Sequence, residues 1–182
     1  GGNALLKWAA ERGEDAARLV AGVAAVCSPL DLAACGRALS SGFNMLYTRM
    51  FLATLKAKSA SKLARFPGLY DAGRLRDARD LYEFDNLVTA PLHGFRDTDD
   101  YWARASAKPV LGGIRVPALA LNARNDPFVP AASLPGPSDI SRWVRLEQPP
   151  QGGHVGFPVR RGTGIAVDWL PDRLIHFFET QT

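Results

Sequence analysis

Two short apolar runs, near residues 20–27 and 117–123, and a shorter strand-like segment near 142–148 stand out in a chain that is otherwise mixed in polarity. Each run is followed within a few residues by proline or glycine, and none shows helical periodicity. Continuous apolar runs of this length are typical of strands that are buried on both faces, as in a parallel sheet. The sequence therefore predicts a parallel sheet of about three strands.

The long stretch between the first and second predicted strands has a different pattern. From Phe43 to Phe66, apolar residues recur at spacings of three and four, with Lys and Arg among them. This pattern predicts an amphipathic helix or a pair of helices, which Pro67 ends. The charged residues of 71–105 predict further short helices. We therefore expect a helical cap insert over 43–105.

Helices are also predicted at both ends of the chain. The first covers about residues 2–12, and another short helix is expected after Asp31 as its N-cap. The last covers 167–181, with an apolar face made of Leu170, Leu174, Phe177 and Phe178. Strands that alternate with helices indicate an α/β fold. We expect residues 1–182 to form part of one such domain, with the insert inside it.

Composition and charge narrow the class of protein. The chain has 182 residues, of which 47% are hydrophobic and 22% charged, as in an ordinary globular domain. The net charge of +4 is spread along the chain rather than gathered in a basic stripe, which argues against nucleic-acid binding. No apolar stretch reaches the ~18–20 residues of a membrane helix.

The two cysteines, Cys27 and Cys35, have a spacing that fits no familiar zinc motif. We interpret Cys27 as a reduced core residue at the end of a strand. Reduced cysteines favour a cytoplasmic location. The sequence predicts no metal site and no cofactor.

Asp126 and His154 are the residues that best fit chemistry. Each follows a predicted strand, at the sheet edge where ligands of α/β proteins gather. Alone, Asp126 could equally cap a turn before Pro127, and His154 could lie in a surface loop. Together, an acid followed by a histidine matches the second half of a Ser, Asp, His triad in chain order. We interpret His93 as structural or surface and His176 as a packing residue.

A nucleophile is missing from this pattern. No G-x-S-x-G elbow occurs within residues 1–182. If Gly1 is the last glycine of such an elbow, the serine stands two residues before it. Gly1, Gly2 and Asn3 would then lie near the elbow, and the helix that they begin would stabilise negative charge at the site.

Several longer stretches resemble one family. GGNALLKW, SPLDLAAC, LYEFDNLVTAPLHGF, NARNDPFVP and GGHVGF are similar to the YheT-like (embryogenesis-associated-protein-like) branch of the α/β-hydrolases, from Gly1 to about Phe157. The resemblance implies the C-terminal part of a serine carboxylesterase, beginning just after the nucleophile elbow. It places the triad acid on Asp126 and the triad base on His154.

Two other interpretations stay open at this point. One is an α/β-hydrolase-like scaffold that binds a ligand without catalysis. The other is a membrane-surface protein that uses the basic amphipathic face of the insert. On the hydrolase reading, the partner is a small acyl ester, and the 182-residue chain alone is expected to be inactive. The same reading predicts self-association or pairing with an N-terminal half.

Overall fold

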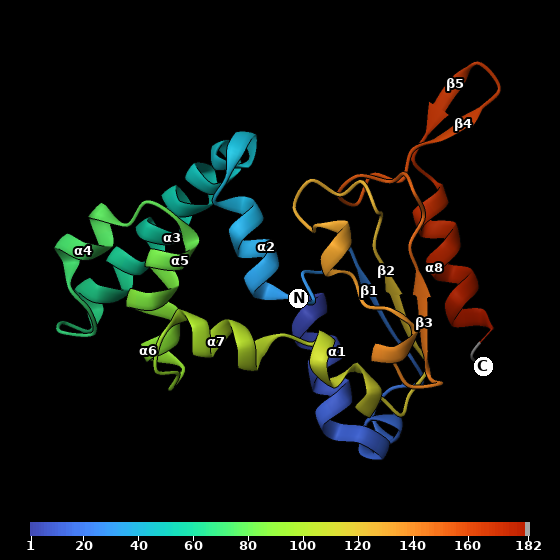
Figure 1. Ribbon diagram of the computed structural model, residues 1–182, viewed down its shortest axis with the longest axis horizontal. Coiled ribbons are helices and arrows are strands. Elements are labelled where there is room, and N and C mark those ends of the chain that lie inside the picture. Colours follow the sequence, from blue (N-terminus) through green and yellow to red (C-terminus); the bar gives the residue numbers. More distant parts are fainter. Residues whose placement is uncertain (181–182) are drawn as a thin grey trace. The chain divides into compact units, whose positions relative to one another are not determined.

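The computed structural model describes residues 1–180 and contains a parallel sheet of three strands (Figure 1). Strands β1 (Val23–Val26), β2 (Ala118–Leu121) and β3 (Val144–Glu147) pair in that order, and both pairs are parallel. The predicted sheet is therefore confirmed, with each strand somewhat shorter than predicted. The in-step register brings the carboxyl ends of all three strands to one edge.

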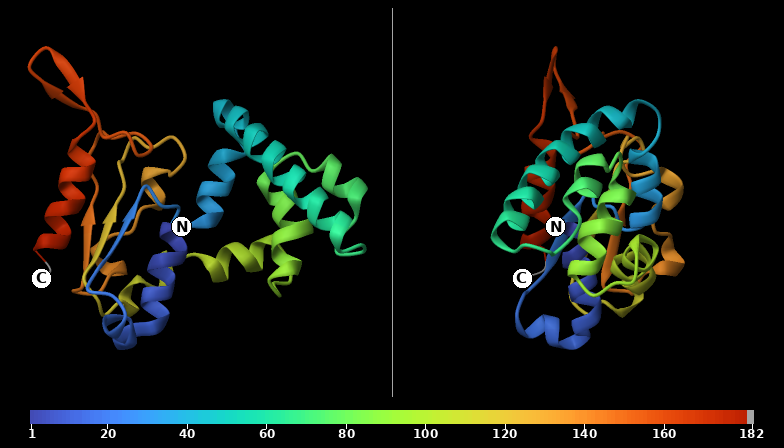
Figure 2. Two further views of the ribbon diagram at one scale, coloured as in Figure 1. Left: turned by 180° about the vertical axis from the view of Figure 1, so that it is seen from behind. Right: turned by 90° about the vertical axis from the view of Figure 1, so that its left-hand side faces the viewer.

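Helices α1 (Gly2–Arg12) and α8 (Trp169–Glu179) lie on opposite faces of the sheet (Figures 1 and 2). Successive side chains of a strand point to opposite faces, so each strand contributes to two cores. Leu6 and Ala9 of α1 pack on the face that carries Val23, Ala25, Ala118, Ala120 and Val144. Phe177 of α8 packs on the face that carries Ala24, Val26, Leu119 and Leu121.

The stretch between β1 and β2 is helical, as predicted. Its α-helices are α2 (Leu32–Leu39), α3 (Met45–Arg65), α4 (Ala72–Asp77), α5 (Leu81–Phe84), α6 (Ala90–Leu92) and α7 (Thr98–Ala105). A π-helical turn, Asp85–Thr89, joins α5 to α6. Short 3-10 helices span Gly13–Arg18, Gly42–Asn44, Lys108–Gly113, Ala131–Ser133 and Pro137–Asp139.

The chain divides into two compact units. One contains residues 1–31 and the chain from Ala105 onward, and the other is Leu32–Arg104. The second unit begins before residue 43, where the insert was expected to start, because α2 belongs to it. Gly36 of α2 packs directly against the ring of Trp102 in α7. That this unit acts as a cap stays a prediction.

Asp85 organises the interior of the second unit. Its carboxylate accepts hydrogen bonds from Trp102 Nε1 (2.9 Å) and Thr89 Oγ1 (2.6 Å). Burial raises the pKa of this carboxyl, while the two hydrogen bonds act in the opposite direction. Phe84 and Val88, on either side along the chain, belong to the core of the unit. Much of the LYEFDNLVTAPLHGF stretch therefore serves packing within this unit.

A hairpin between residues 159 and 166 was absent from the sequence-based prediction. Strands β4 (Val159–Arg161) and β5 (Gly164–Ala166) pair antiparallel and project from the sheet unit just before α8 (Figure 1). Gly162 has a φ of 59°, and a positive φ at the first position is what a two-residue hairpin loop requires. The available signal was the Gly-Thr-Gly at 162–164, with one β-branched residue in each flanking strand, Val159 and Ile165.

The closing helix is shorter than expected. It begins at Trp169 and ends at Glu179, whereas the last predicted residue, Gln181, lies outside the described residues. Phe177 is 2% exposed but Phe178 is 43% exposed, so the expectation that both face the core is wrong for Phe178. Consecutive helix residues are about 100° apart around the axis, so Phe178 lies beside the face on which Phe177 is buried.

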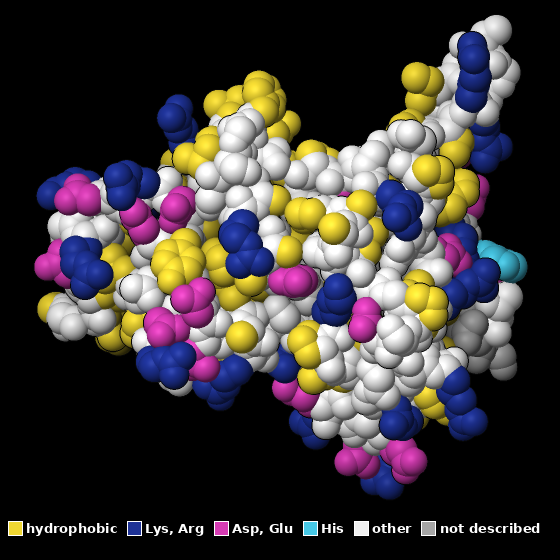
Figure 3. All heavy atoms as spheres, viewed as in Figure 1, with side chains coloured by type: hydrophobic (Ala, Val, Ile, Leu, Met, Phe, Trp, Pro, Cys, Tyr) yellow, Lys and Arg dark blue, Asp and Glu magenta, His cyan; other side chains and the backbone are white. Residues whose placement is uncertain are grey.

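Surface charge is mixed in the part of the chain that the structure describes. On the face shown in Figure 3, Lys and Arg side chains are interspersed with Asp and Glu side chains. Among residues 1–180, no helix is both long enough and apolar enough to cross a membrane.

The contact between Gly36 and Trp102 gives a test of the second unit. A methyl group added at Gly36 would lie 2.3 Å from the ring of Trp102, which is 5% exposed and held by Asp85. Gly36→Ala should lower the free energy of unfolding by about 1–3 kcal/mol through overpacking. Denaturant unfolding followed by tryptophan fluorescence would measure this.

Gly112→Ala is the matched control for that experiment, because the nearest atom to its added methyl would be 3.8 Å away. It should change stability by less than about 0.5 kcal/mol. Equal stability of Gly36→Ala and the unmodified protein would contradict the described packing.

Candidate active site

The carboxyl ends of the three parallel strands carry the groups that could perform chemistry. Cys27 directly follows β1, Asp126 lies five residues after β2, and His154 lies seven residues after β3. Asn122 joins the first two of these ends, because its Nδ2 donates to the carbonyl oxygen of Ser28 at 3.1 Å within the core. The strand pairing therefore brings three chain segments to one place.

The structure brings Asp126 and His154 into direct contact. His154 Nδ1 lies 2.9 Å from Asp126 Oδ2, in hydrogen-bonding geometry. The side chain of Asp126 is fully buried, whereas that of His154 is 38% exposed. Asp126 Oδ1 accepts a hydrogen bond from the backbone N–H of Phe128 at 2.9 Å, which fixes the carboxylate. The rings of Phe128 and His154 also pack in a T-shaped arrangement, with their centroids 4.8 Å apart.

The glycine-rich loop at 151–157 reaches Asp126 because Gly152 has no side chain. A Cβ at Gly152 would lie 2.6 Å from the ring of Phe157 and 2.7 Å from Ala123 Cβ. The close approach of this loop to the end of β2 therefore requires glycine. Asn125, in the segment that follows β2, also binds this loop, since its Oδ1 accepts the N–H of Gly153 at 2.9 Å. The segment that contains Asp126 is thus hydrogen-bonded to the loop that contains His154, through Asn125 and Gly153.

Cys27 is a third group at this place, and sequence reasoning missed its proximity to Asp126 and His154. It is a buried free thiol, as expected, but its Sγ accepts the backbone N–H of Val155 at 3.3 Å, next to His154. Ligand atoms of Cys27, Asp126 and His154 all lie within 4.8 Å of one another. Burial raises the pKa of the Cys27 thiol, the hydrogen bond from Val155 lowers it, and the charge of Asp126 raises it further. The available signal was that Cys27 ends a predicted parallel strand.

The first residues of α1 lie at the same edge of the sheet. A Cβ at Gly2 would lie 1.9 Å from Ser28 Oγ, so the helix begins against the end of β1 only because residue 2 is glycine. Asn3 holds the helix from the other side. Its Nδ2 donates to the carbonyl oxygen of Ala105, and its Oδ1 accepts the N–H of Ala107, both at 2.8 Å. Gly1 is exposed.

Comparison with known proteins places these features in a family. The chain is 38% identical to YheT of Escherichia coli (strain K12), provisionally named an esterase, over 159 residues. It is 32% identical to phospholipase ABHD3 of Mus musculus over 126 residues, and 37% identical to monoacylglycerol lipase of Saccharomyces cerevisiae over 107 residues. No family model and no solved structure matches.

The chain belongs to the YheT-like family of α/β-hydrolases. The match to YheT covers 86% of this chain and 46% of YheT, and the match to ABHD3 covers 68% and 31%. The match to the yeast lipase covers 58% and 23%. The chain therefore spans about half the length of YheT, and a smaller share of ABHD3 and of the yeast lipase.

The other two histidines of this YheT-like chain are exposed, and the carboxylate of Asp126 pairs with His154. His93 is exposed and follows α6 in the second unit, in agreement with its interpretation as a surface residue. His176 is also exposed, so the expectation that it packs against the apolar face of α8 is wrong. It neighbours the buried Phe177 in sequence, but the helical rotation between them turns it to solvent.

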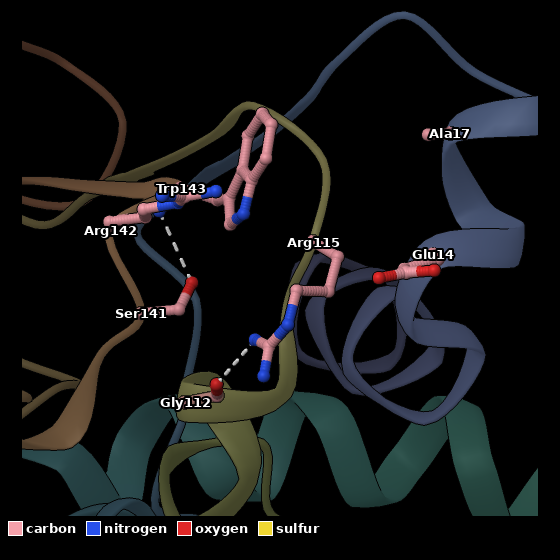
Figure 4. Close-up of a pocket in the computed structure, with 7 residues that line it drawn as sticks. All are labelled: Glu14, Ala17, Gly112, Arg115, Ser141, Arg142 and Trp143. Carbon is pink, nitrogen blue, oxygen red and sulfur yellow. Dashed lines mark hydrogen bonds between the residues drawn. The ribbon is translucent and has the colours of Figure 1, made fainter.

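A hollow of about 660 Å³ lies at the opposite edge of the sheet (Figure 4). It is lined by Glu14, Ala17, Gly112, Arg115, Ser141, Arg142 and Trp143, near the amino ends of β2 and β3. Arg115 donates to the carbonyl oxygen of Gly112, and Ser141 Oγ accepts the N–H of Trp143. Its lining contains no histidine, and its serine also donates to the carbonyl of Ile114. The candidate site is therefore the edge that carries Asp126 and His154.

The clamp formed by Asn3 can be tested through stability. Asn3→Ala should lower the free energy of unfolding by about 1–3 kcal/mol, because it leaves the N–H of the fully buried Ala107 without its acceptor. Asn125→Ala is the matched control, since it also removes two side-chain hydrogen bonds but at exposed positions that water can reach. Chemical denaturation of both variants would measure the difference. A larger loss for Asn125→Ala would contradict the description of α1.

Proposed function

We propose that this protein hydrolyses carboxylic esters through a Ser-Asp-His triad. Asp126 is the acid, His154 is the base, and the nucleophile is a serine that precedes Gly1 in the whole protein. The observation that carries the proposal is the 2.9 Å contact between His154 Nδ1 and the fully buried carboxylate of Asp126. The names of the relatives, which include an esterase and two lipases, support an ester as the substrate.

The reaction follows from the chemistry of these groups. The serine hydroxyl attacks the carbonyl carbon of the ester, and His154 Nε2 accepts the hydroxyl proton. Asp126 accepts the hydrogen bond from Nδ1–H, which keeps the lone pair on Nε2 and stabilises the imidazolium. His154 then donates the proton to the leaving alcohol, and water hydrolyses the acyl-enzyme by the same route.

The surroundings of the pair suit this role. Burial of Asp126 removes water from around its charge, so its attraction for the imidazolium is screened less than at the surface. His154 is partly exposed, which lets its far nitrogen meet a nucleophile and a substrate. The N-terminus of α1, at Gly1, Gly2 and Asn3, provides backbone N–H groups that would stabilise an oxyanion.

We also propose that the insert 43–105 serves as a cap that lines a site for the acyl chain. Phe43, Leu46 and Met50 support this role, because they follow helical spacing and are between 52% and 79% exposed. We further propose that the edge strand β1 pairs with a partner. This partner would be either strands that precede Gly1 or a second copy of the chain.

Removal of the proposed base gives the main test. In the whole protein, His154→Ala should lower turnover of a short- or medium-chain activated ester by several orders of magnitude, since members of a triad act as a unit. His93→Ala and His176→Ala should keep most of the activity, because both side chains are exposed and the Asp126 carboxylate is paired with His154. Steady-state kinetics on one ester would compare the three variants.

Two further measurements sharpen this test. The 182-residue chain alone should be inactive, because it holds no G-x-S-x-G nucleophile. Wild-type turnover in His154→Ala would exclude the triad mechanism. Absence of hydrolysis of any ester by the whole protein, together with tight binding of an acyl ligand, would favour a non-catalytic scaffold.

The cap proposal predicts a dependence on acyl-chain length. Met50→Ser should raise KM for a long-chain ester about 10-fold while leaving KM for an acetate ester nearly unchanged, because only the long chain would contact Met50. Lys58→Ala, on the same helix and also exposed, is the control and should change neither value. An equal change of KM for both esters in Met50→Ser would contradict an acyl-chain contact.

A further inference from the structure

Cys27 is a buried nucleophilic group for which the triad mechanism has no use. Its Sγ accepts the N–H of Val155 and lies 3.7 Å from the carbonyl oxygen of Gly153, so it touches the backbone on both sides of His154. Among residues 1–180, Cys27, Asp126 and His154 are the group of sulfur, oxygen and nitrogen ligands that lie close enough to share one ion. They come from the ends of three different strands, which fixes their relative positions.

The spacing of these atoms suits a tetrahedral ion. Atoms bound to one zinc ion lie roughly 3.5 Å apart, given bonds of about 2.0–2.3 Å. Here the three ligand atoms lie within 4.8 Å of one another, and the Nδ1 and Oδ2 atoms are 2.9 Å apart. An ion could therefore replace the proton between His154 and Asp126 with small movements of the side chains. The side chain of His154 is 38% exposed, so solvent reaches one of the three ligand residues.

We propose that Cys27, Asp126 and His154 form a binding site for a thiophilic divalent cation, with Zn²⁺ as the biological ion, and that its binding switches off hydrolysis. The part concerning hydrolysis rests on the proposed function, whereas the binding does not. Mixed sulfur, nitrogen and oxygen ligands select zinc or cadmium over magnesium and calcium. The N–H of Val155 would continue to donate to the bound sulfur and would support it as an outer partner.

Proton balance explains the inhibition. The thiol proton of Cys27 leaves to solvent as the metal–sulfur bond forms, so binding releases a proton without any redox change. Because the lone pair of His154 Nδ1 then faces the ion, the neutral ring carries its proton on Nε2. An imidazole in that form cannot accept a proton from the nucleophile. The ion thus occupies the acid-base pair rather than blocking the substrate site.

Cobalt substitution tests the binding in the whole protein. After treatment with a chelator, Co²⁺ should produce a thiolate-to-cobalt charge-transfer absorption, which excess Zn²⁺ removes. Cys27→Ser should weaken Co²⁺ binding by more than about 100-fold, beyond the range for losing an outer partner. Cys35→Ser is the matched control, since Cys35 is the other buried free cysteine, and should keep the absorption. Absorption that persists in Cys27→Ser, or is absent from the unmodified protein, would overturn the proposal.

A second variant and an activity measurement complete the test. Asp126→Asn removes the anionic carboxylate ligand, so it should weaken Co²⁺ binding. Because it preserves side-chain volume, it keeps the test valid if circular dichroism shows that Cys27→Ser is poorly folded. With Zn²⁺, the unmodified protein and Cys35→Ser should lose most of their own metal-free rate and regain it with chelator. Inhibition of Cys27→Ser to the same extent would overturn the proposal. If no ester is hydrolysed, the proposed function fails, while the cobalt absorption still decides the metal site.

Discussion

The parallel, in-step pairing of β1, β2 and β3 is the constraint on which the site depends. Because each strand ends at the same edge, residues far apart in the chain meet there, even though the whole second unit lies between β1 and β2 in sequence. Asn122 strengthens this edge by joining the end of β2 to Ser28. The central strand β2 is fully buried between the cores on the two faces of the sheet. The packing of both cores therefore fixes the position of this edge. The chemistry is thus placed by the sheet and only finished by the loops.

Asp126 and His154 could be predicted from the sequence because both the strands and the turn residues leave clear local signals. Apolar runs predicted the strands, and the glycines and Asn-Asp-Pro predicted where the chain leaves the sheet. The contact between Cys27 and the loop that carries His154 could not be predicted in the same way. The contact of Cys27 with Val155 depends on how a loop from β3 folds back over β1, which no local pattern records. The catalytic roles themselves stay proposals.

Other departures have the same physical origin. The apolar pattern of the closing helix could not show which of Phe177 and Phe178 is buried, because both are apolar and adjacent. Tertiary packing decides which of them faces the core. The hairpin at 159–166 was missed because strands of three residues are too short for a periodic signal. The start of the second unit at Leu32 depends on the contact between Gly36 and Trp102, which are distant in sequence.

The backbone around His154 is strained, and packing of the adjacent core offsets the free-energy cost of that strain. Cys27, Val155 and Phe157 all have a positive φ, at 47°, 60° and 40°, which costs about 1–3 kcal/mol for each non-glycine residue. Phe157 is 3% exposed and stacks on Trp169 of α8, with ring centroids 5.3 Å apart. Burial of two aromatic rings supplies free energy of comparable size. Helix α8 therefore belongs to the support of the site, although no residue of it takes part in the proposed chemistry.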